Sequence, residues 1–572
     1  MSTTTRRRAS LISLCLCLCS TLAASHAAPA PPEARVDRLL ASMSLEARVG
    51  QMFMVSVWGP ELPVNGRRFI EQTAPGGVVL FENNVGAPAS MVRLTNALQE
   101  TATAGGGPPL FIAIDQEGGL IARLKPEQGF TPFPVGQVIT ASGDPDNAAA
   151  VGRAIAEELL AVGVNMNLAP VADLETRREN AVVARRAFGS DPERVGRMIA
   201  AFVQGAQAAG VVAVAKHFPG HGETTQDSHT GLPVVEHDLE RLRRVELVPF
   251  QHAVDAGVGA IMAAHIWFPA LEPVERRPAS LSYPILTGLL RETMGYQGLI
   301  MTDALDMNAI DRRFFYGEAA RLAVQAGVDL IAFGGQVSLD DQQAAIQDVI
   351  AAVQRGEISA SRIDASARRI LETKARFGLL DWSPRDPAAA AGALHAEAHR
   401  ALVVDLFRQG ITLVKDEGAH LPLDPARTNL LVYLTWYSEI AAVCRGRMPG
   451  LRLAGIPYVP GENDVARVVD AARYADTVVV LTNDAITVPE QAALVNALPP
   501  ERTVVVAMRS PYDLLSFPKV SGYVAVYAPI LETFPVICDV LLGDLAPRGA
   551  LPVTLSAQYP AGTGLRGYAL RP

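Results

Sequence analysis

The segment KHFPGHG at 216–222 contains the densest group of reactive side chains in the sequence. Glu223 follows directly, and Asp227 and His229 stand two residues apart a little further on. A carboxylate this close to an imidazole can accept its ring N–H, fix its tautomer and raise its pKa. The pair Asp227 and His229 is therefore suited to act as a general acid near neutral pH.

The same segment allows a second interpretation, a metal site formed by His217, His221, Asp227 and His229. Imidazoles and carboxylates are common zinc ligands. However, a Pro-Gly pair separates the first two histidines, and it prevents the helical presentation that places two histidine ligands on one face. We therefore expect no metal at this segment and no effect of EDTA.

Other polar residues stand at the ends of short apolar runs. They are Asp115, Lys216, His217, His265 and Asp303. A polar residue in such a place can simply begin a turn or cap the next helix, as Asp303 could do for the element from Ala304 onward. The whole set has a different explanation, because side chains at the C-terminal ends of the strands of a (β/α)8 barrel converge on one face.

Eight apolar runs precede residue 334, and most gaps between them leave room for a helix. Continuous apolar runs are typical of parallel strands that are buried on both faces. Eight alternations over about 300 residues match a (β/α)8 barrel better than an open sheet. The predicted strands are 52–57, 77–81, 110–115, 164–170, 211–217, 260–265, 299–303 and 328–333.

A Pro/Ala-rich stretch, LDWSPRDPAAAA at 380–391, predicts the end of the barrel domain. Five further apolar runs, at 410–414, 429–434, 477–481, 503–507 and 522–527, alternate with helical patterns and predict a smaller α/β sandwich. The predicted division of the chain is a signal peptide at 1–27, a barrel at 28–385, a linker at 386–397 and the second domain at 398–572.

The N-terminus has the pattern of an export signal. Three arginines at 6–8 precede an apolar stretch at 11–24 and a Ser-His-Ala sequence that a signal peptidase could cleave. The apolar stretch is 14 residues long, whereas about 20 are needed to span a bilayer. We therefore expect a periplasmic or secreted protein with no stable membrane insertion, although the segment does not distinguish Sec from twin-arginine export.

Charge and cysteine content narrow the function classes further. The 572 residues include 50 Lys and Arg against 59 Asp and Glu, a net charge of −9, and no strongly basic stretch. Binding to nucleic acid is therefore not expected. After removal of the signal segment two cysteines remain, Cys444 and Cys538, and the sequence does not decide whether they pair. Stability must then come mainly from a large apolar core.

These motifs resemble those of the β-N-acetylhexosaminidase branch of glycoside hydrolase family 3, over about residues 35–380. The matching stretches are IAIDQEGGLIARL (112–124), RRAFGSDPERVG (185–196), AKHFPGHGETTQDSHTGLPVV (215–235), MAAHIWFPALEP (262–273) and GLIMTDALDM (298–307). The KHFPGHG-to-DSH part is the most specific. VVVAMRSPYDL (504–514) and GALPVTL (549–555) resemble the second domain of longer members.

The resemblance implies a retaining exo-glycosidase that removes terminal N-acetylglucosamine and needs no cofactor. It implies Asp303 as the nucleophile, kept ionised by Lys216 and Arg186, and His229 as the acid/base with Asp227 as its partner. The implied substrate-binding residues are Asp115, Arg123, Arg186, Lys216, His217 and His265. No catalytic residue is expected in the second domain.

Two alternatives stay open at this point. Phosphate could replace water, which would make the protein an N-acetylglucosaminide phosphorylase, or the barrel could serve as a sugar-binding protein of the cell envelope without turnover. A pure receptor has no need of a nucleophile or an acid, which favours the enzyme. Peptidoglycan fragments and chitin oligomers both end in N-acetylglucosamine, so the residues do not separate these two substrates.

Overall fold

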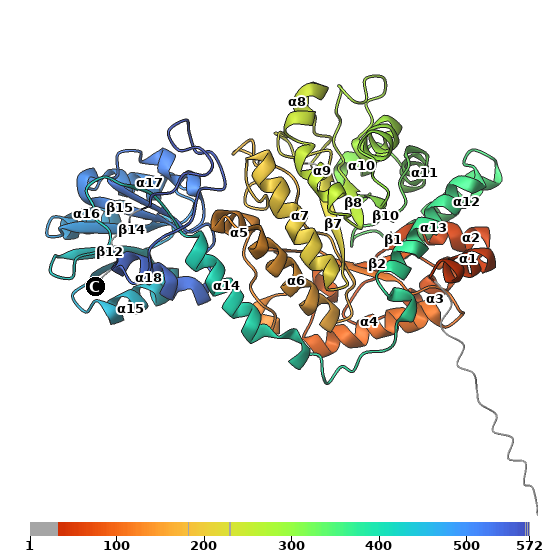
Figure 1. Ribbon diagram of the computed structural model, residues 1–572, viewed down its shortest axis with the longest axis horizontal. Helices are drawn as coiled ribbons and strands as arrows, with labels where there is room; N and C mark the ends of the chain where they lie inside the picture. Colours follow the sequence, from red (N-terminus) through yellow and green to blue (C-terminus); the bar gives the residue numbers. More distant parts are fainter. Residues whose placement is uncertain (1–31, 181, 228–229, 567, 569, 571–572) are drawn as a thin grey trace, which may run out of the picture.

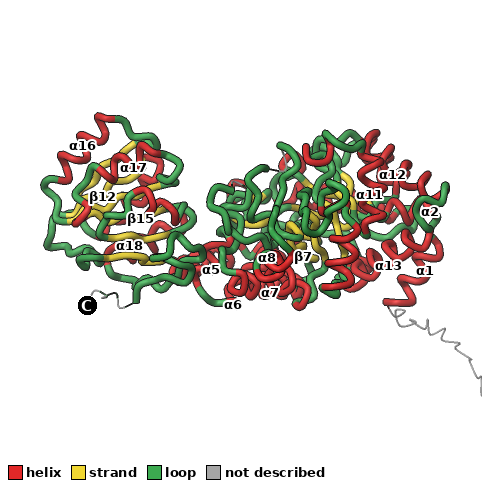
Figure 2. The backbone as a smooth tube through the Cα atoms, turned by 90° about the horizontal axis from the view of Figure 1, so that it is seen from above, coloured by secondary structure: helices red, strands yellow, loops and turns green. Residues whose placement is uncertain are grey.

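Two α/β domains lie side by side and are joined by the long helix α14 (Ala396–Gly410) (Figure 1). The computed structural model describes residues 32–180, 182–227, 230–566, 568 and 570. The predicted signal peptide at 1–27 and the proposed acid/base His229 therefore lie outside the described residues. Viewed from above, each domain has its strands inside and its helices outside (Figure 2).

The first domain is a (β/α)8 barrel, as the sequence predicted. Its strands are β1 (Phe53–Val55), β2 (Gly77–Leu80), β3 (Phe111–Ile114), β6 (Met166–Asn167), β7 (Val212–Phe218), β8 (Ala260–Ala263), β9 (Leu299–Thr302) and β10 (Ile331–Ala332). All are parallel, in the order β10-β1-β2-β3-β6-β7-β8-β9, and a bridge between Met301 and Leu330 closes the ring. Seven strands lie within the predicted runs, and β7 extends one residue beyond its run.

Every strand of the ring is buried along its whole length, which explains the continuous apolar runs. The helices around the ring cover the outer faces of these strands. They are α1 (Pro32–Ser42), α2 (Leu45–Gly50), α3 (Val64–Thr73), α4 (Pro88–Thr103), α5 (Gly136–Ser142), α6 (Pro145–Ala161), α7 (Pro192–Ala208), α8 (Leu239–Arg244), α9 (Val248–Asp255), α10 (Asn308–Asp311), α11 (Tyr316–Ala326), α12 (Leu339–Gln354), α13 (Ala360–Arg376) and a π-helix at Pro284–Thr293.

A small hairpin that the sequence analysis did not predict extends from β3. It consists of β4 (Gln116–Gly118) and β5 (Ile121–Ala122). Gly118 and Gly119 turn the chain here with φ of +95° and +61°, values that glycine adopts without steric cost. The hairpin places Glu117 and Arg123 at the C-terminal end of the barrel strands.

The second domain contains one six-stranded sheet between helices, in the order β11-β16-β15-β14-β12-β13. β11 is antiparallel to β16, and the other neighbours are parallel. The strands are β11 (Thr412–Asp416), β12 (Asn429–Leu434), β13 (Arg452–Ile456), β14 (Thr477–Thr482), β15 (Thr503–Ala507) and β16 (Gly522–Ala525), and the helices are α15 (Ser438–Arg447), α16 (Glu462–Ala472), α17 (Pro489–Asn496) and α18 (Phe534–Leu542). The expected sandwich is therefore present, with β13 as a sixth strand that was not predicted.

A disulfide between Cys444 and Cys538 joins α15 to α18. It answers the question of pairing that the sequence left open. Within the described part of the chain, no helix combines the length and the apolar character that a membrane crossing requires.

The two domains share an extensive interface. Helix α14 packs against α5 and α6 of the barrel domain, and the His399 ring lies 2.9 Å from Glu158 and 3.1 Å from Glu157 of α6. The guanidinium of Arg194 donates to the carbonyl oxygens of Thr140, in the barrel domain, and Leu551, in the second domain. These contacts fix the second domain beside the loops that follow β6.

Glu175 lies buried at this interface, and we expect it to make the stability of the folded protein depend on pH. It accepts a hydrogen bond from Gln137 over 2.5 Å, and it lies near the backbone of Arg185 and near Tyr512 of the second domain. Burial nevertheless raises the pKa of Glu175 to about 7. The unfolded chain releases the Glu175 proton near its ordinary pKa of 4.5. The protonated side chain of Glu175 therefore contributes fully to the free energy of unfolding below pH 4.5, and this contribution is lost as the pH rises to about 7.

Glutamine mimics the protonated acid, so Glu175→Gln is expected to raise the free energy of unfolding above pH 7 by about 2–3 kcal/mol and to have little effect at pH 4.5. Calorimetric Tm values of both proteins between pH 4.5 and 8 measure this, with the exposed Glu179 replaced by Gln as the control. A Tm difference that is the same at all pH values would contradict the assignment.

Candidate active site

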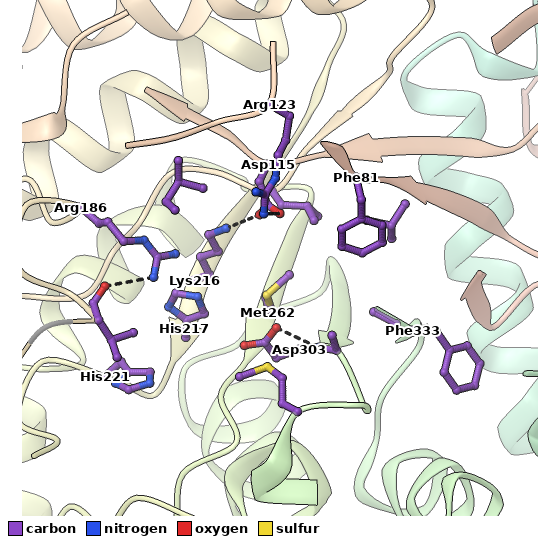
Figure 3. Close-up of a pocket in the computed structure, with 17 residues that line it drawn as sticks. Phe81, Asp115, Arg123, Arg186, Lys216, His217, His221, Met262, Asp303 and Phe333 are labelled. Atoms are coloured by element: carbon purple, nitrogen blue, oxygen red, sulfur yellow. Dashed lines mark hydrogen bonds and ion pairs between the residues drawn. The ribbon is translucent and has the colours of Figure 1, made fainter. Parts of the chain in front are cut away.

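A cavity of about 210 Å³ opens at the C-terminal ends of the barrel strands (Figure 3). We call it the inner cavity. The lining residues that the sequence predicted are Asp115, Arg123, Arg186, Lys216, His217 and Asp303. The structure thus brings six predicted site residues, from five segments of the chain, around one space.

Lys216 is the buried centre of a charge network in this cavity. Its Nζ lies 2.7 Å from Asp115 and 2.7 Å from Glu117, and Arg123 lies 3.3 Å from the other oxygen of Asp115. Burial alone would raise the pKa of Asp115, but the two cations outweigh it and lower the pKa to about 2. Burial likewise opposes the charge of Lys216, yet the two carboxylates raise its pKa. These groups stay charged near neutral pH and can hydrogen-bond sugar hydroxyls.

Arg186 is fixed by Glu117, a residue to which the sequence analysis gave no role. Nε and Nη2 of Arg186 donate to the two oxygens of Glu117 over 2.9 and 2.7 Å, and Nη1 donates to the carbonyl of Val182. Burial would raise the pKa of Glu117, but Lys216 and Arg186 lower it. Its position two residues after Asp115, in a quoted motif, was the signal that could have identified it.

Asp173 is a second site residue that was not predicted. One oxygen of its fully buried carboxylate lies 2.6 Å from Nδ1 of His217, and the other accepts the backbone N–H groups of His217 and His221. Asp173 thereby sets the orientation of His217 in the cavity wall. His221 lines the same wall, and burial lowers its pKa to about 4.

The loop that follows β7 is tied to the loop that follows β6. The side-chain amide of Asn180 donates to the carbonyls of His221 and Gly222 over 2.8 and 3.0 Å. A Cβ on Gly222 would lie only 2.0 Å from the carbonyl oxygen of Leu174, so only glycine fits this approach. Asp227 lies further along this loop, whereas His229 falls outside the described residues, so their pairing stays a prediction.

Asp303 follows β9 and is partly exposed to the inner cavity. Its carboxylate accepts the N–H of Ala304 over 2.8 Å. Desolvation would raise its pKa, but the imidazoles of His217 and His265, the Ala304 amide and Lys216 together lower it. The acid is therefore ionised near neutral pH, as a nucleophile must be.

One expectation about Asp303 needs correction, and one alternative for it is excluded. Lys216 does lower the pKa of Asp303, but Arg186, which was expected to help, is paired with Glu117. Asp303 also does not cap the following helix, because α10 begins only at Asn308.

His265 occupies a supporting position instead of the substrate-facing one that the resemblance implied. Nδ1 lies 2.7 Å from the hydroxyl of Ser280, and Nε2 lies 3.0 Å from the carbonyl oxygen of Ala304. The residue is buried and is not one of the described residues that line the inner cavity. It therefore holds the chain directly behind Asp303.

Within the described ranges, one group of side chains has the arrangement of metal ligands: Glu223, His237 and Glu246, whose ligand atoms lie within 4.8 Å of one another. Arg241 already forms an ion pair with Glu246 at 2.7 Å and lies 3.8 Å from Glu223. His237 lies 3.2 Å from Glu223. Arg241 is thus already near both carboxylates, and the contacts of this group hold the two ends of the loop after β7 together.

Residues 44–373 match the model of the glycosyl hydrolase family 3 N terminal domain. The chain belongs to glycoside hydrolase family 3. Over 554 residues it is 32% identical to β-hexosaminidase A of Pseudoalteromonas piscicida, an alignment that spans 86% of this chain and 92% of that protein. A β-hexosaminidase of Pseudomonas aeruginosa is 35% identical over 310 residues, 54% of this chain and 87% of that protein.

A solved structure extends the similarity of this family 3 chain to both domains. The glycoside hydrolase family 3 β-N-acetylglucosaminidase from Paenibacillus sp. FPU-7 superposes with a TM-score of 0.77 at 36% identity, and the match covers 90% of this chain and 99% of that one. The family predicted from the motifs is therefore confirmed, and this chain is a glycosidase.

The inner cavity of this glycosidase continues into an outer cavity of about 540 Å³. The two share Asp115, Arg123 and Asp303. The outer cavity adds the exposed ring of Trp58 and the carboxylate of Asp306, which accepts the N–H of Gly334 over 2.9 Å. Asp303 thus stands at the junction of a small inner space and a wider outer one.

Proposed function

We propose that this family 3 glycosidase is a retaining exo-acting β-N-acetylhexosaminidase that releases terminal β-linked N-acetylglucosamine. The observation that carries the proposal is the ionised Asp303 at the junction of the two cavities, in a wall lined by Lys216, Asp115 and Arg186. The names of the relatives, β-hexosaminidases and a β-N-acetylglucosaminidase, support this sugar specificity.

In the first step the carboxylate of Asp303 attacks the anomeric carbon of the sugar in the inner cavity. The bond to the leaving oxygen breaks, and His229 supplies the proton that this oxygen takes up. In the second step His229 removes a proton from water, whose oxygen replaces Asp303 at the anomeric carbon. Histidine suits this role, because the protonated ring supplies the first proton, the neutral ring that remains takes a proton from water, and neither form repels the nearby Asp303 carboxylate. In the proposed pair, Asp227 raises the pKa of the ring.

The sizes of the two cavities support removal of a single end sugar. The inner cavity of about 210 Å³ is proposed to hold the terminal unit, and the outer cavity takes the leaving group, with the face of Trp58 available for stacking on a sugar ring. Chitin oligomers and peptidoglycan fragments both present such an end.

The disulfide between Cys444 and Cys538 supports an exported location, since disulfides persist mainly outside the reducing cytosol. The proposed location is therefore the periplasm or the medium, as the N-terminal sequence predicts.

Product analysis tests the function directly. The purified protein is incubated with N,N′-diacetylchitobiose, and separately with a peptidoglycan-derived disaccharide, in the presence and absence of phosphate. Free N-acetylglucosamine formed at a rate independent of phosphate is the expected result. A sugar 1-phosphate that increases with phosphate would make the protein a phosphorylase, and binding without any product would make it a receptor.

A further inference from the structure

Three non-glycine residues at the domain interface adopt the left-handed backbone conformation. They are Arg185 with φ of +73°, Asp484 with φ of +62° and Tyr527 with φ of +72°. This conformation is unfavourable for residues with a Cβ and persists only where surrounding contacts impose it. Arg185 belongs to the barrel domain, whereas Asp484 and Tyr527 belong to the second domain, so the interface itself is the place where those contacts are concentrated.

The buried carboxylate of Asp484 joins the two domains. One of its oxygens lies 3.3 Å from Arg185 of the barrel domain and 3.3 Å from Arg509 of the second domain. Asp484 is only 2% exposed. An ion pair in such an enclosed position constrains the arginines more than an exposed pair would.

The backbone of Arg185 lies on the same side of the interface. It is near the buried carboxylate of Glu175, and Glu175 in turn lies near Tyr512 of the second domain. The side chain of Arg185 is thus held by the second domain, and its backbone is enclosed where the two domains meet.

The next residue in the chain is Arg186, whose guanidinium lines the inner cavity (Figure 3). The same guanidinium is hydrogen-bonded to Glu117. If Arg185 lost its contacts and relaxed to the ordinary right-handed conformation, its φ would change by roughly 130°. Such a rotation would redirect the chain at Arg186 and weaken the hydrogen bonds that hold its guanidinium on Glu117.

We propose that the second domain positions the substrate-binding Arg186 through the ion pair between Asp484 and Arg185. Asp484 is then a positioning residue of the glycosidase, and this is the contribution of the second domain to the active site. The proposal rests on the proposed function, because it takes Arg186 to contact the sugar.

The test uses the full-length protein and the aryl glycoside 4-nitrophenyl N-acetyl-β-glucosaminide. Asp484→Asn is expected to raise KM about tenfold and to change kcat much less. A tenfold change corresponds to the weakening of one charged hydrogen bond to the substrate. The inhibition constant of free N-acetylglucosamine is expected to rise by a similar factor. Asp484→Glu, which keeps the charge, is expected to recover part of the loss.

Arg509→Gln is the matched control, because Arg509 contacts the same carboxylate but is not adjacent to Arg186. Its KM is expected to stay within about twofold of the wild type. Arg185→Gln also removes the ion pair between Asp484 and Arg185, and it replaces Asp484→Asn in the test if that variant does not fold. Combining Arg185→Gln with Asp484→Asn is expected to add nothing to the effect of either change.

The outcomes separate this inference from the proposed function. A wild-type protein that does not act on the aryl glycoside would overturn the function itself. An active wild type whose KM is the same in Asp484→Asn and in the Arg509→Gln control would overturn only the positioning role. The positioning role would also be overturned if the double variant raised KM by the product of the factors measured for the two single variants.

Discussion

Asp303→Ala is expected to lower kcat on an aryl N-acetylglucosaminide by at least about 10⁴-fold while leaving the fold intact. The carboxylate is the proposed nucleophile, and its described protein contact is a hydrogen bond from the adjacent Ala304 amide. Because the groups around it lower its pKa, the ionised side chain stabilises the folded protein, and its removal should lower Tm without unfolding the protein. Steady-state rates and Tm together measure both parts of this expectation.

The small space left by the substitution allows a chemical check. Azide can enter it and attack the anomeric carbon from the face that Asp303 used, so added azide is expected to restore turnover and to give the α-glycosyl azide. Asp306→Asn is the matched control on the same loop, since asparagine keeps the acceptor for Gly334. Its kcat is expected to stay within about tenfold of the wild type. Equal losses in both variants would remove the special role of Asp303.

His229→Ala is expected to affect substrates according to their leaving groups. A sugar leaving group needs a proton, so kcat/KM for N,N′-diacetylchitobiose should fall about 10³-fold. A 2,4-dinitrophenolate leaves without a proton, so kcat/KM for that glycoside should fall by no more than about tenfold. The ratio of the two losses is the quantity that reports proton donation.

His237→Ala provides the control for this experiment. It removes another imidazole from the same loop, one that contacts Glu223, and any disturbance of the loop should affect both substrates alike. A His229→Ala protein that loses the same factor on both substrates would show that His229 shapes the loop and does not donate the proton.

The barrel could be predicted because its strands are buried on both faces. A doubly buried strand must be apolar at consecutive positions, and the runs that contain β3 and β9 show this directly. The edge strand β13 lacks such a run, since Arg452 and two further residues of its five are at least partly exposed. The hairpin of β4 and β5 is too short and too polar to give any pattern.

The candidate site likewise contains residues that the sequence predicted and residues that it did not. Asp115, Lys216 and Asp303 stand at strand ends, where the geometry of a barrel predicts convergence. Asp173 and Glu117 act through partners that lie 44 and 69 residues away, His217 and Arg186. Contacts over such separations are determined by tertiary packing, so even where a motif points to a residue, as it does for Glu117, the sequence does not show which partner the residue binds. The same holds for the pairing of Cys444 with Cys538 across 94 residues.

The central claim is a covalent intermediate on Asp303, and trapping it is the most direct test. The protein is treated with a 5-fluoro N-acetylglucosaminyl fluoride, which slows release of the intermediate, then digested and mapped by mass spectrometry. One added sugar is expected on the peptide that contains Asp303, and none on the same peptide of Asp303→Ala. A label on a different residue, or a first product with inverted anomeric configuration, would contradict the central claim.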